Sequence, residues 1–203
     1  MIPEKRLTFA RDLCYNGFII HNTGIIMNKV YIVEGQDRCG KSTVVDLLRR
    51  NIKNPKIIVI HSAKPPKDVD LEEWTLAHYR NLNKTVYFLI QEGYDVILDR
   101  SYLGETVYGP LYRSVSIPLK TLELSNAIKQ ELIVLVDDAS SIASRSDGLS
   151  MSDDIAMLEA ERKAFRDSFF ASSVANKELI DWEYESFSKS KLEAFVKGMI
   201  IRA

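Results

Sequence analysis

Short apolar runs along the chain alternate with longer segments in which apolar residues recur at helical spacing. The runs predict five strands: Val30 to Glu34, Ile57 to His61, Asp95 to Asp99, Leu132 to Asp137 and Glu178 to Trp182. The segments between and after them predict five helices: Lys41 to Ile52, Leu71 to Glu92, Thr121 to Gln130, Asp153 to Ala171 and Lys189 to Ile201. This alternation predicts an α/β fold, a five-stranded parallel sheet with helices on both faces.

Local signals mark where helices begin and where loops lie. Pro118 precedes the third predicted helix, and Ser152 precedes the fourth. Pro65-Pro66 and residues 139 to 152 are predicted as loops. In an open α/β sheet, ligands bind at loops that follow the carboxyl ends of the strands.

Composition narrows the class of protein. A chain of 203 residues that is 46% hydrophobic suits one globular domain with one sizeable core. The net charge of −1 gives no overall field to attract nucleic acid or acidic lipid, so neither partner is expected. Any site for an anion is therefore local.

Several features of the sequence indicate the cellular compartment in which the protein is expected. The cysteines, Cys14 and Cys39, are too few for a disulfide framework, which favours a reducing, cytoplasmic location. No run of about 18 apolar residues predicts a membrane span. Residues 1 to 26 lack the pattern of a signal peptide and are interpreted as an N-terminal extension of unknown role, before a domain over residues 27 to 203.

The most specific motif follows the first predicted strand. Residues Gly35 to Thr43 match G-x-x-x-x-G-K-[ST], the Walker A or phosphate loop (P-loop). Its glycines let backbone N–H groups surround phosphates, Lys41 reaches the β- and γ-phosphates, and Ser42 offers a hydroxyl to Mg²⁺. The predicted donor-nucleotide contacts within the loop are Gly35, Gln36, Asp37, Arg38, Cys39, Gly40, Lys41, Ser42 and Thr43. The sequence therefore predicts a site for ATP and Mg²⁺.

A second charged pair ends the third predicted strand. Asp99 occupies a Walker B position and can hold Mg²⁺, usually through water. The next residue, Arg100, can bind a phosphate through a planar pair of donors. Both residues are expected beside the phosphate loop.

These motifs resemble the thymidylate kinase family of P-loop nucleoside monophosphate kinases. The matching residues are Val33 to Thr43, Asp99-Arg100 and Tyr108, nine positions after Asp99. The resemblance covers all but the first 26 residues. It implies transfer of a phosphoryl group from Mg-ATP to dTMP or a related deoxynucleoside monophosphate, and it suggests a homodimer.

The resemblance also implies roles for individual residues. Asp37 contacts the sugar hydroxyl of the acceptor, and Arg38 bridges the donor and acceptor phosphates. Tyr108 lies near the acceptor sugar, where it would crowd a ribose 2′-hydroxyl and favour a deoxynucleotide. Transfer between two anions needs positive charge that follows the moving group, so the predicted catalytic set is Asp37, Arg38, Lys41 and Arg100.

Elsewhere the chain departs from the family pattern. After the second strand, Lys64 stands where the family has an arginine for the acceptor phosphate. On the long second helix, Trp74, Tyr79 and Arg80 are candidates for the base pocket, although position 76, four residues before the arginine, is Leu. Core packing is the alternative interpretation of these aromatic residues.

Residues 139 to 152 occupy the place of the family's lid, a mobile segment that closes over ATP. Arg145 is the candidate for contact with the donor nucleotide. Whether Arg38 or Arg145 supplies the catalytic charge is left open by the sequence.

Two other functions remain open. A deoxynucleoside kinase would need a base to deprotonate a 5′-hydroxyl, typically a Glu after the second strand, where this chain has His61 and Lys64. A P-loop ATPase or switch acting on a protein partner is the alternative from another class. A GTP switch is disfavoured, because the nearest match to N-K-x-D has Leu179 in place of the aspartate.

Overall fold

The computed structural model describes residues 13–15, 18–20, 28–145, 148, 150–182 and 188–202. Its main sheet has five parallel strands in the order β4-β5-β3-β6-β7. Their bounds are β3 (Val30–Gly35), β4 (Ile57–His61), β5 (Asp95–Asp99), β6 (Gln130–Val136) and β7 (Lys177–Asp181). The predicted five-stranded parallel sheet is confirmed, with differences of one or two residues at some strand ends.

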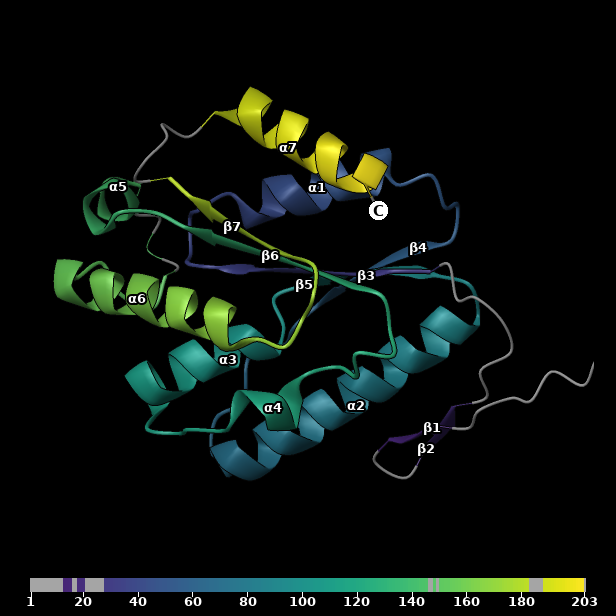
Figure 1. Cartoon of the computed structure of the whole chain (residues 1–203). Coiled ribbons are helices and arrows are strands. Elements are labelled where there is room, and N and C mark those ends of the chain that lie inside the picture. The colour runs from purple at the N-terminus through teal and green to yellow at the C-terminus, as the bar shows by residue number, and fades with distance from the viewer. Residues whose placement is uncertain are drawn as a thin grey trace, which may run out of the picture.

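Helices cover both faces of this sheet, as the sequence predicts (Figure 1). One face carries α1 (Lys41–Asn51) and α7 (Lys189–Arg202), and the other carries α2 (Leu71–Gln91), α3 (Tyr102–Tyr108), α4 (Leu119–Leu122) and α6 (Ile155–Ala171). The short helix α5 (Ala139–Ser144) follows β6, and a π-helix, η1 (Gly109–Arg113), continues α3.

Each face of the central strand packs into a separate core. Val30 and Ile32 lie in the cluster that includes residues of α2, α3 and α6. Tyr31 and Val33 point the opposite way and lie in the cluster with α1 and α7. Because successive side chains alternate across a sheet, one apolar run serves both cores.

The strand β3 ends where the backbone comes very close to its neighbour β6. Gly35 has φ of 133°, and a Cβ atom built on it would lie 1.9 Å from the backbone oxygen of Leu135. A side chain is therefore excluded at the first position of the phosphate loop, which fixes how the loop leaves the sheet.

The helix predicted over Thr121 to Gln130 is wrong. α4 ends at Leu122, and Glu123 already has extended backbone angles. The Glu123 carboxylate accepts hydrogen bonds from Ser172 Oγ at 2.7 Å and from the Ser173 N–H at 3.0 Å. Side-chain contacts with the segment after α6 thus replace the helix.

Two further differences lie near the ends of strands. Residues 139 to 144 were predicted within a loop but form α5, because Asp138 caps the helix by accepting from the Ser141 N–H at 2.9 Å. No helix is predicted from the sequence between the third predicted strand and Pro118, where α3 and η1 lie.

The predicted N-terminal extension falls mostly outside the described residues. Within it, β1 (Leu13–Tyr15) and β2 (Phe18–Ile20) pair as a separate antiparallel sheet. Among the helices of the described segments, none is both long enough and apolar enough to span a bilayer.

Candidate active site

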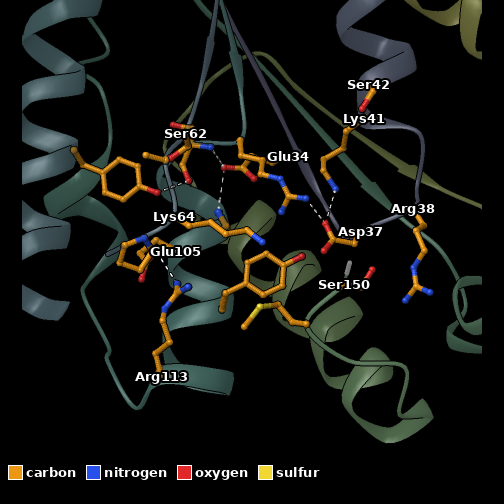
Figure 2. A pocket seen from close by; sticks show the side chains of 18 of the residues that line it. Glu34, Asp37, Arg38, Lys41, Ser42, Ser62, Lys64, Glu105, Arg113 and Ser150 are labelled. Carbon is orange, nitrogen blue, oxygen red and sulfur yellow. Dashed lines mark hydrogen bonds and ion pairs between the residues drawn. The ribbon is translucent and has the colours of Figure 1, made fainter. Parts of the chain in front are cut away.

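A cavity of about 790 Å³ lies where the phosphate loop, the loop after β4, α3 and the end of the predicted lid come together. It is lined by Glu34, Asp37, Arg38, Gly40, Lys41, Ser42, Ser62, Ala63, Lys64, Pro65, Tyr79, Arg100, Ser101, Gly104, Glu105, Tyr108, Arg113, Ser150 and Met151. Figure 2 shows this pocket with the side chains of most of these residues. Residues far apart in the sequence therefore meet at the carboxyl ends of β3, β4 and β5.

The helix that follows the phosphate loop has no capping side chain. At α2, α5 and α6, the side-chain carboxylates of Asp70, Asp138 and Asp154 respectively accept a hydrogen bond from a backbone N–H of the first turn. At α1 the corresponding residue is Gly40, which has φ of 91° and makes no side-chain cap. Because the first N–H groups of a helix bind anions, this uncapped end fits a phosphate group.

Lys41 lies folded against the loop that precedes it. Its Nζ donates to the Gly35 oxygen at 2.9 Å and to the Gln36 oxygen, and lies 3.5 Å from the Asp37 carboxylate. Burial lowers the pKa of its ammonium, and the nearby Arg100 charge lowers it further. A negatively charged group in the cavity would replace these carbonyl contacts with a stronger partner for the ammonium.

Asp37 and Arg100 form an ion pair beside Lys41. Burial alone would raise the pKa of Asp37, but the charges of Lys41 and Arg100 outweigh it and lower the pKa. Arg100 adopts a left-handed backbone with φ of 66°, which a non-glycine residue rarely does. The structure thus brings the predicted residues Asp37, Lys41 and Arg100 together.

Arg38 extends in another direction, toward the start of α6. Its Nη1 lies 2.8 Å from the Asp153 carboxylate, and its Nη2 donates to the Ser152 oxygen at 3.3 Å. Like Arg100, it has φ of 66°. Arg38 lines the cavity while its guanidinium joins the phosphate loop to the end of the predicted lid.

Two residues of the loop serve its structure. The buried Gln36 side chain donates to the Leu158 oxygen at 2.8 Å and accepts from the Asp137 N–H at 3.1 Å. Cys39 is fully buried, and this burial raises the pKa of its thiol to about 12. The side chains of Gln36 and Cys39, both predicted as nucleotide contacts, thus face protein, and the Gln36 backbone N–H donates to the Leu135 oxygen at 3.1 Å.

Of the two predicted metal ligands, Ser42 lines the cavity and Asp99 does not. Ser42 is exposed at the start of α1 and lines the cavity. Asp99 lies two residues after Ile97 on β5, so its side chain is on the same face of the sheet as Ile97, which packs with α1. The Asp99 carboxylate lies 2.8 Å from His61 Nδ1 on β4. Within the described ranges, no cluster of three or more His, Cys, Asp or Glu side chains is placed to hold a metal ion.

Glu34 is a feature of the site that the sequence analysis did not assign. Its carboxylate accepts from the N–H groups of Ser101 at 2.6 Å and Gly104 at 3.1 Å, at the start of α3. Burial raises its pKa to about 7. The residue before the phosphate loop therefore caps α3 and sets the position of that helix against the loop.

The aromatic candidates have different surroundings. Tyr108 lines the cavity, and its buried hydroxyl has no hydrogen-bond partner in the described part of the chain. Tyr79 also lines the cavity, but its hydroxyl donates to the Ser101 oxygen at 3.0 Å. Trp74 stacks on the His78 ring with centroids 4.7 Å apart, and Arg80 is exposed; neither lines the cavity.

Of the two other cationic residues predicted to contact nucleotide, one lines the cavity and the other does not. Lys64 is exposed in the loop after β4 and lines the cavity, as its predicted role requires. Arg145 lies at the end of α5, where its guanidinium pairs with Asp137 and its Nε donates to the Ser141 oxygen at 3.1 Å. Arg145 is not among the residues that line the cavity.

An ion pair that the sequence analysis missed lies across the cavity from the phosphate loop. Arg113 Nη2 donates to Glu105 Oε2 at 2.7 Å, joining η1 to α3 (Figure 2). The two residues are eight positions apart and flank Gly109-Pro110. Their opposite charges are the signal in the sequence, but that spacing does not predict a contact in an α-helix.

No protein-family model matches the sequence, and no curated protein matches it. Solved structures share its fold, and three of them are described below. A YorR protein from Bacillus subtilis in complex with phosphorylated GDP is 19% identical, with 85% of this chain and 95% of that chain covered and a TM-score of 0.59. The thymidylate kinase of Candida albicans is 16% identical, with 86% and 92% covered and a TM-score of 0.63.

The thymidylate kinase of Ehrlichia chaffeensis is 12% identical, with 86% of this chain and 98% of that chain covered and a TM-score of 0.59. The chain therefore has the fold of a P-loop NTPase, in the form found in thymidylate kinases. At these identities the likeness concerns the fold.

Proposed function

We propose that the protein is an ATP-dependent deoxynucleoside monophosphate kinase that phosphorylates dTMP or a related deoxynucleoside monophosphate. The observation that carries this proposal is one cavity shared by the phosphate loop, Arg100 and the loop after β4. The two neighbours named as thymidylate kinases support this acceptor, and the YorR protein with phosphorylated GDP supports a nucleotide in this fold.

The donor end of the cavity is the start of α1. The uncapped N–H groups of the loop and Lys41 hold the β- and γ-phosphates of ATP. Ser42 and Asp99 would hold Mg²⁺, which would neutralise charge on those phosphates. For this, Lys41 exchanges the backbone oxygens of Gly35 and Gln36 for phosphate oxygens. Arg145 remains the proposed lid contact to the donor.

The acceptor lies between Arg100 and Lys64, which bind its phosphate. Asp37 contacts its sugar hydroxyl, and Tyr108 packs where a 2′-hydroxyl would be. An ionised oxygen of the acceptor phosphate attacks the γ-phosphorus, forming one P–O bond while the bond to the β–γ bridging oxygen breaks. No general base is required, and Arg38 supplies positive charge between the two phosphates.

Location and assembly belong to the same proposal. The fully buried Cys39 thiol in the phosphate loop suits the reducing cytoplasm. A homodimer is the assembly that the resemblance to thymidylate kinases suggests, and sedimentation at several protein concentrations measures it.

A nucleoside acceptor is less consistent with the site. Deprotonation of a 5′-hydroxyl needs a base. Where β4 ends, the residues that line the cavity are Ser62, Ala63, Lys64 and Pro65, none of them acidic. Glu34 is held by the backbone of α3, and Glu105 is held by Arg113.

The test is ADP formation from Mg-ATP with dTMP, dUMP, dCMP, dGMP, dAMP, UMP and thymidine supplied separately, with the products identified. A deoxynucleoside diphosphate as product supports the proposal. Phosphorylation of thymidine alone would indicate a nucleoside kinase, and ADP release independent of acceptor would indicate an ATPase or switch. Lys41→Ala serves as the inactive control.

A further inference from the structure

The cavity has two chemically different ends. Lys41, Ser42 and Arg38 lie at one side of the view in Figure 2, and Glu105 and Arg113 lie at the other. If phosphates occupy the first end, the acceptor's base lies toward the second. The side chains there determine which base fits.

The Glu105–Arg113 pair is a buried feature of this far end. The side chains are 9% and 19% exposed, and the one hydrogen bond between them uses Arg113 Nη2 and Glu105 Oε2. Glu105 Oε1 has no hydrogen-bond partner among the described residues, and neither do the other two nitrogens of the Arg113 guanidinium. Both residues line the cavity, and the pair therefore has one acceptor and several donors without a partner in the described part of the protein.

The backbone beside this pair leaves room for the carboxylate. A Cβ atom on Gly109 would lie 3.2 Å from Glu105 Oε1 and 2.7 Å from the Val115 backbone oxygen. The π-helix that begins at Gly109 carries Arg113 back toward α3. The position of the ion pair is thus set by the fold of α3 and η1, rather than by exposed side chains meeting at the surface.

The residues predicted to contact the base do not provide an alternative polar set. Trp74 and Arg80 do not line the cavity, and the Tyr79 hydroxyl already donates to a backbone oxygen. At this end of the cavity the Glu105 carboxylate and the Arg113 guanidinium lie side by side, where a base edge would meet them.

Of the four bases, guanine matches this pair. Its Watson–Crick edge presents two adjacent donors, N1–H and the 2-amino group, next to the O6 acceptor; a carboxylate accepts from the donors, and a guanidinium donates to O6. Thymine presents one N3–H between two carbonyl oxygens, which a carboxylate repels. Adenine and cytosine each place a ring-nitrogen acceptor beside the amino group, so one carboxylate oxygen would face a lone pair.

We propose that Glu105 and Arg113 select guanine in the acceptor, so that the favoured substrate is dGMP and the product is dGDP. This inference rests on the proposed kinase function and replaces dTMP as the favoured acceptor. Glu105 binds the N1–H and the 2-amino group, and Arg113 binds O6 while it holds the carboxylate in place.

The first test compares kcat/KM for dGMP, dIMP, dAMP, dCMP and dTMP at saturating Mg-ATP with the wild-type protein. Deoxyinosine monophosphate (dIMP) differs from dGMP only in lacking the 2-amino group. We expect kcat/KM for dGMP to exceed kcat/KM for dIMP by about 10-fold and kcat/KM for dTMP by about 10- to 100-fold, because one good contact to a base discriminates between bases by this order.

The second test measures the same ratios in Glu105→Gln. An amide offers one acceptor in place of two and adds a donor, so we expect the dGMP to dTMP ratio to fall by about tenfold or more. Glu193→Gln removes a half-exposed α7 carboxylate that also pairs with a basic residue, and it should leave the ratio unchanged. A purely structural role for Glu105 would lower the melting temperature without changing base preference.

The outcomes separate the two proposals. Equal use of all acceptors, or a preference for dTMP that Glu105→Gln does not change, overturns guanine selection and leaves the kinase in place. If no monophosphate is phosphorylated, the kinase proposal fails. Calorimetric titration of the wild-type protein then decides the base site: tighter binding of dGMP than of dIMP and dTMP supports it, and equal or absent binding overturns it. This measurement also applies if Glu105→Gln does not fold.

Discussion

The two ends of the cavity differ in how their charged side chains are held. At the phosphate-loop end, Lys41 is bound by backbone oxygens, Arg100 by Asp37, and Arg38 by Asp153. At the far end, a single hydrogen bond joins Glu105 to Arg113. A nucleotide entering the first end must exchange protein contacts for phosphate contacts, whereas a base entering the second end can add to a pair that is already in place.

Lys41→Ala should give the largest effect and act on every acceptor alike. The substitution removes the ammonium that is proposed to hold the β- and γ-phosphates, so kcat should fall by about 10³-fold or more. Circular dichroism and thermal melting should show a folded protein. Normal turnover in this variant would contradict the assignment of the phosphate loop. A change in base preference would contradict the proposal that the two ends of the cavity have separate roles.

Arg38→Ala should reduce turnover by about 10²- to 10³-fold while the KM for ATP changes by less than about threefold. The reason is that Arg38 is proposed to act on charge that develops between the phosphates, rather than on bound ATP. Arg145→Ala is the matched comparison, because Arg145 pairs with Asp137 outside the cavity. If Arg145→Ala is the slower enzyme and Arg38→Ala turns over normally, the catalytic charge comes from the lid.

Glu34→Gln should change the pH dependence of stability. Burial raises the Glu34 pKa from 4.5 to about 7, so above pH 4.5 the unfolded chain loses this proton before the folded one does. Stability from this group is therefore lost as pH rises from about 4.5 to about 7. The free energy of unfolding of Glu34→Gln relative to wild type should rise by about 3 kcal/mol across that window.

Urea denaturation of both proteins at pH 4.5 and pH 8 measures this shift. Glu193→Gln is the control, because a hydrogen bond to Lys197 lowers the Glu193 pKa instead of raising it. The gain between the two pH values should therefore be absent in the control. A relative stability of Glu34→Gln that is the same at both pH values would contradict ionisation of a buried Glu34.

The sequence predicted those parts of the fold that depend on local pattern. Strand β3 is an apolar run, and the loop from Gly35 to Thr43 contains residue types that its backbone conformation requires. Gly35 is an example, because no side chain fits at that position. The segment after Leu122 was mispredicted because Glu123 bonds to residues about 50 positions away. Helical periodicity carries no information about such contacts.

The residues of the candidate site also include some that local sequence pattern predicts and others that it does not. Asp37, Lys41 and Arg100 could be predicted because strand ends and the phosphate loop meet in any sheet of this topology. Glu105 and Arg113 could not, because their contact depends on a π-helix whose Gly-Pro start indicates only a break. Glu34 is one residue from the motif, yet its bonds to α3 follow from the packing of the whole face.

The contact between Trp182 and the phosphate loop provides an intrinsic optical probe. The indole Nε1 donates to the Cys39 backbone oxygen at 3.2 Å, and the ring is buried. The chain has two tryptophans, so Trp74→Phe would leave the emission of Trp182 alone. Any rearrangement of the loop backbone on binding a phosphate would then alter the fluorescence of one chromophore, and loop motion could be timed by stopped-flow mixing without an attached label.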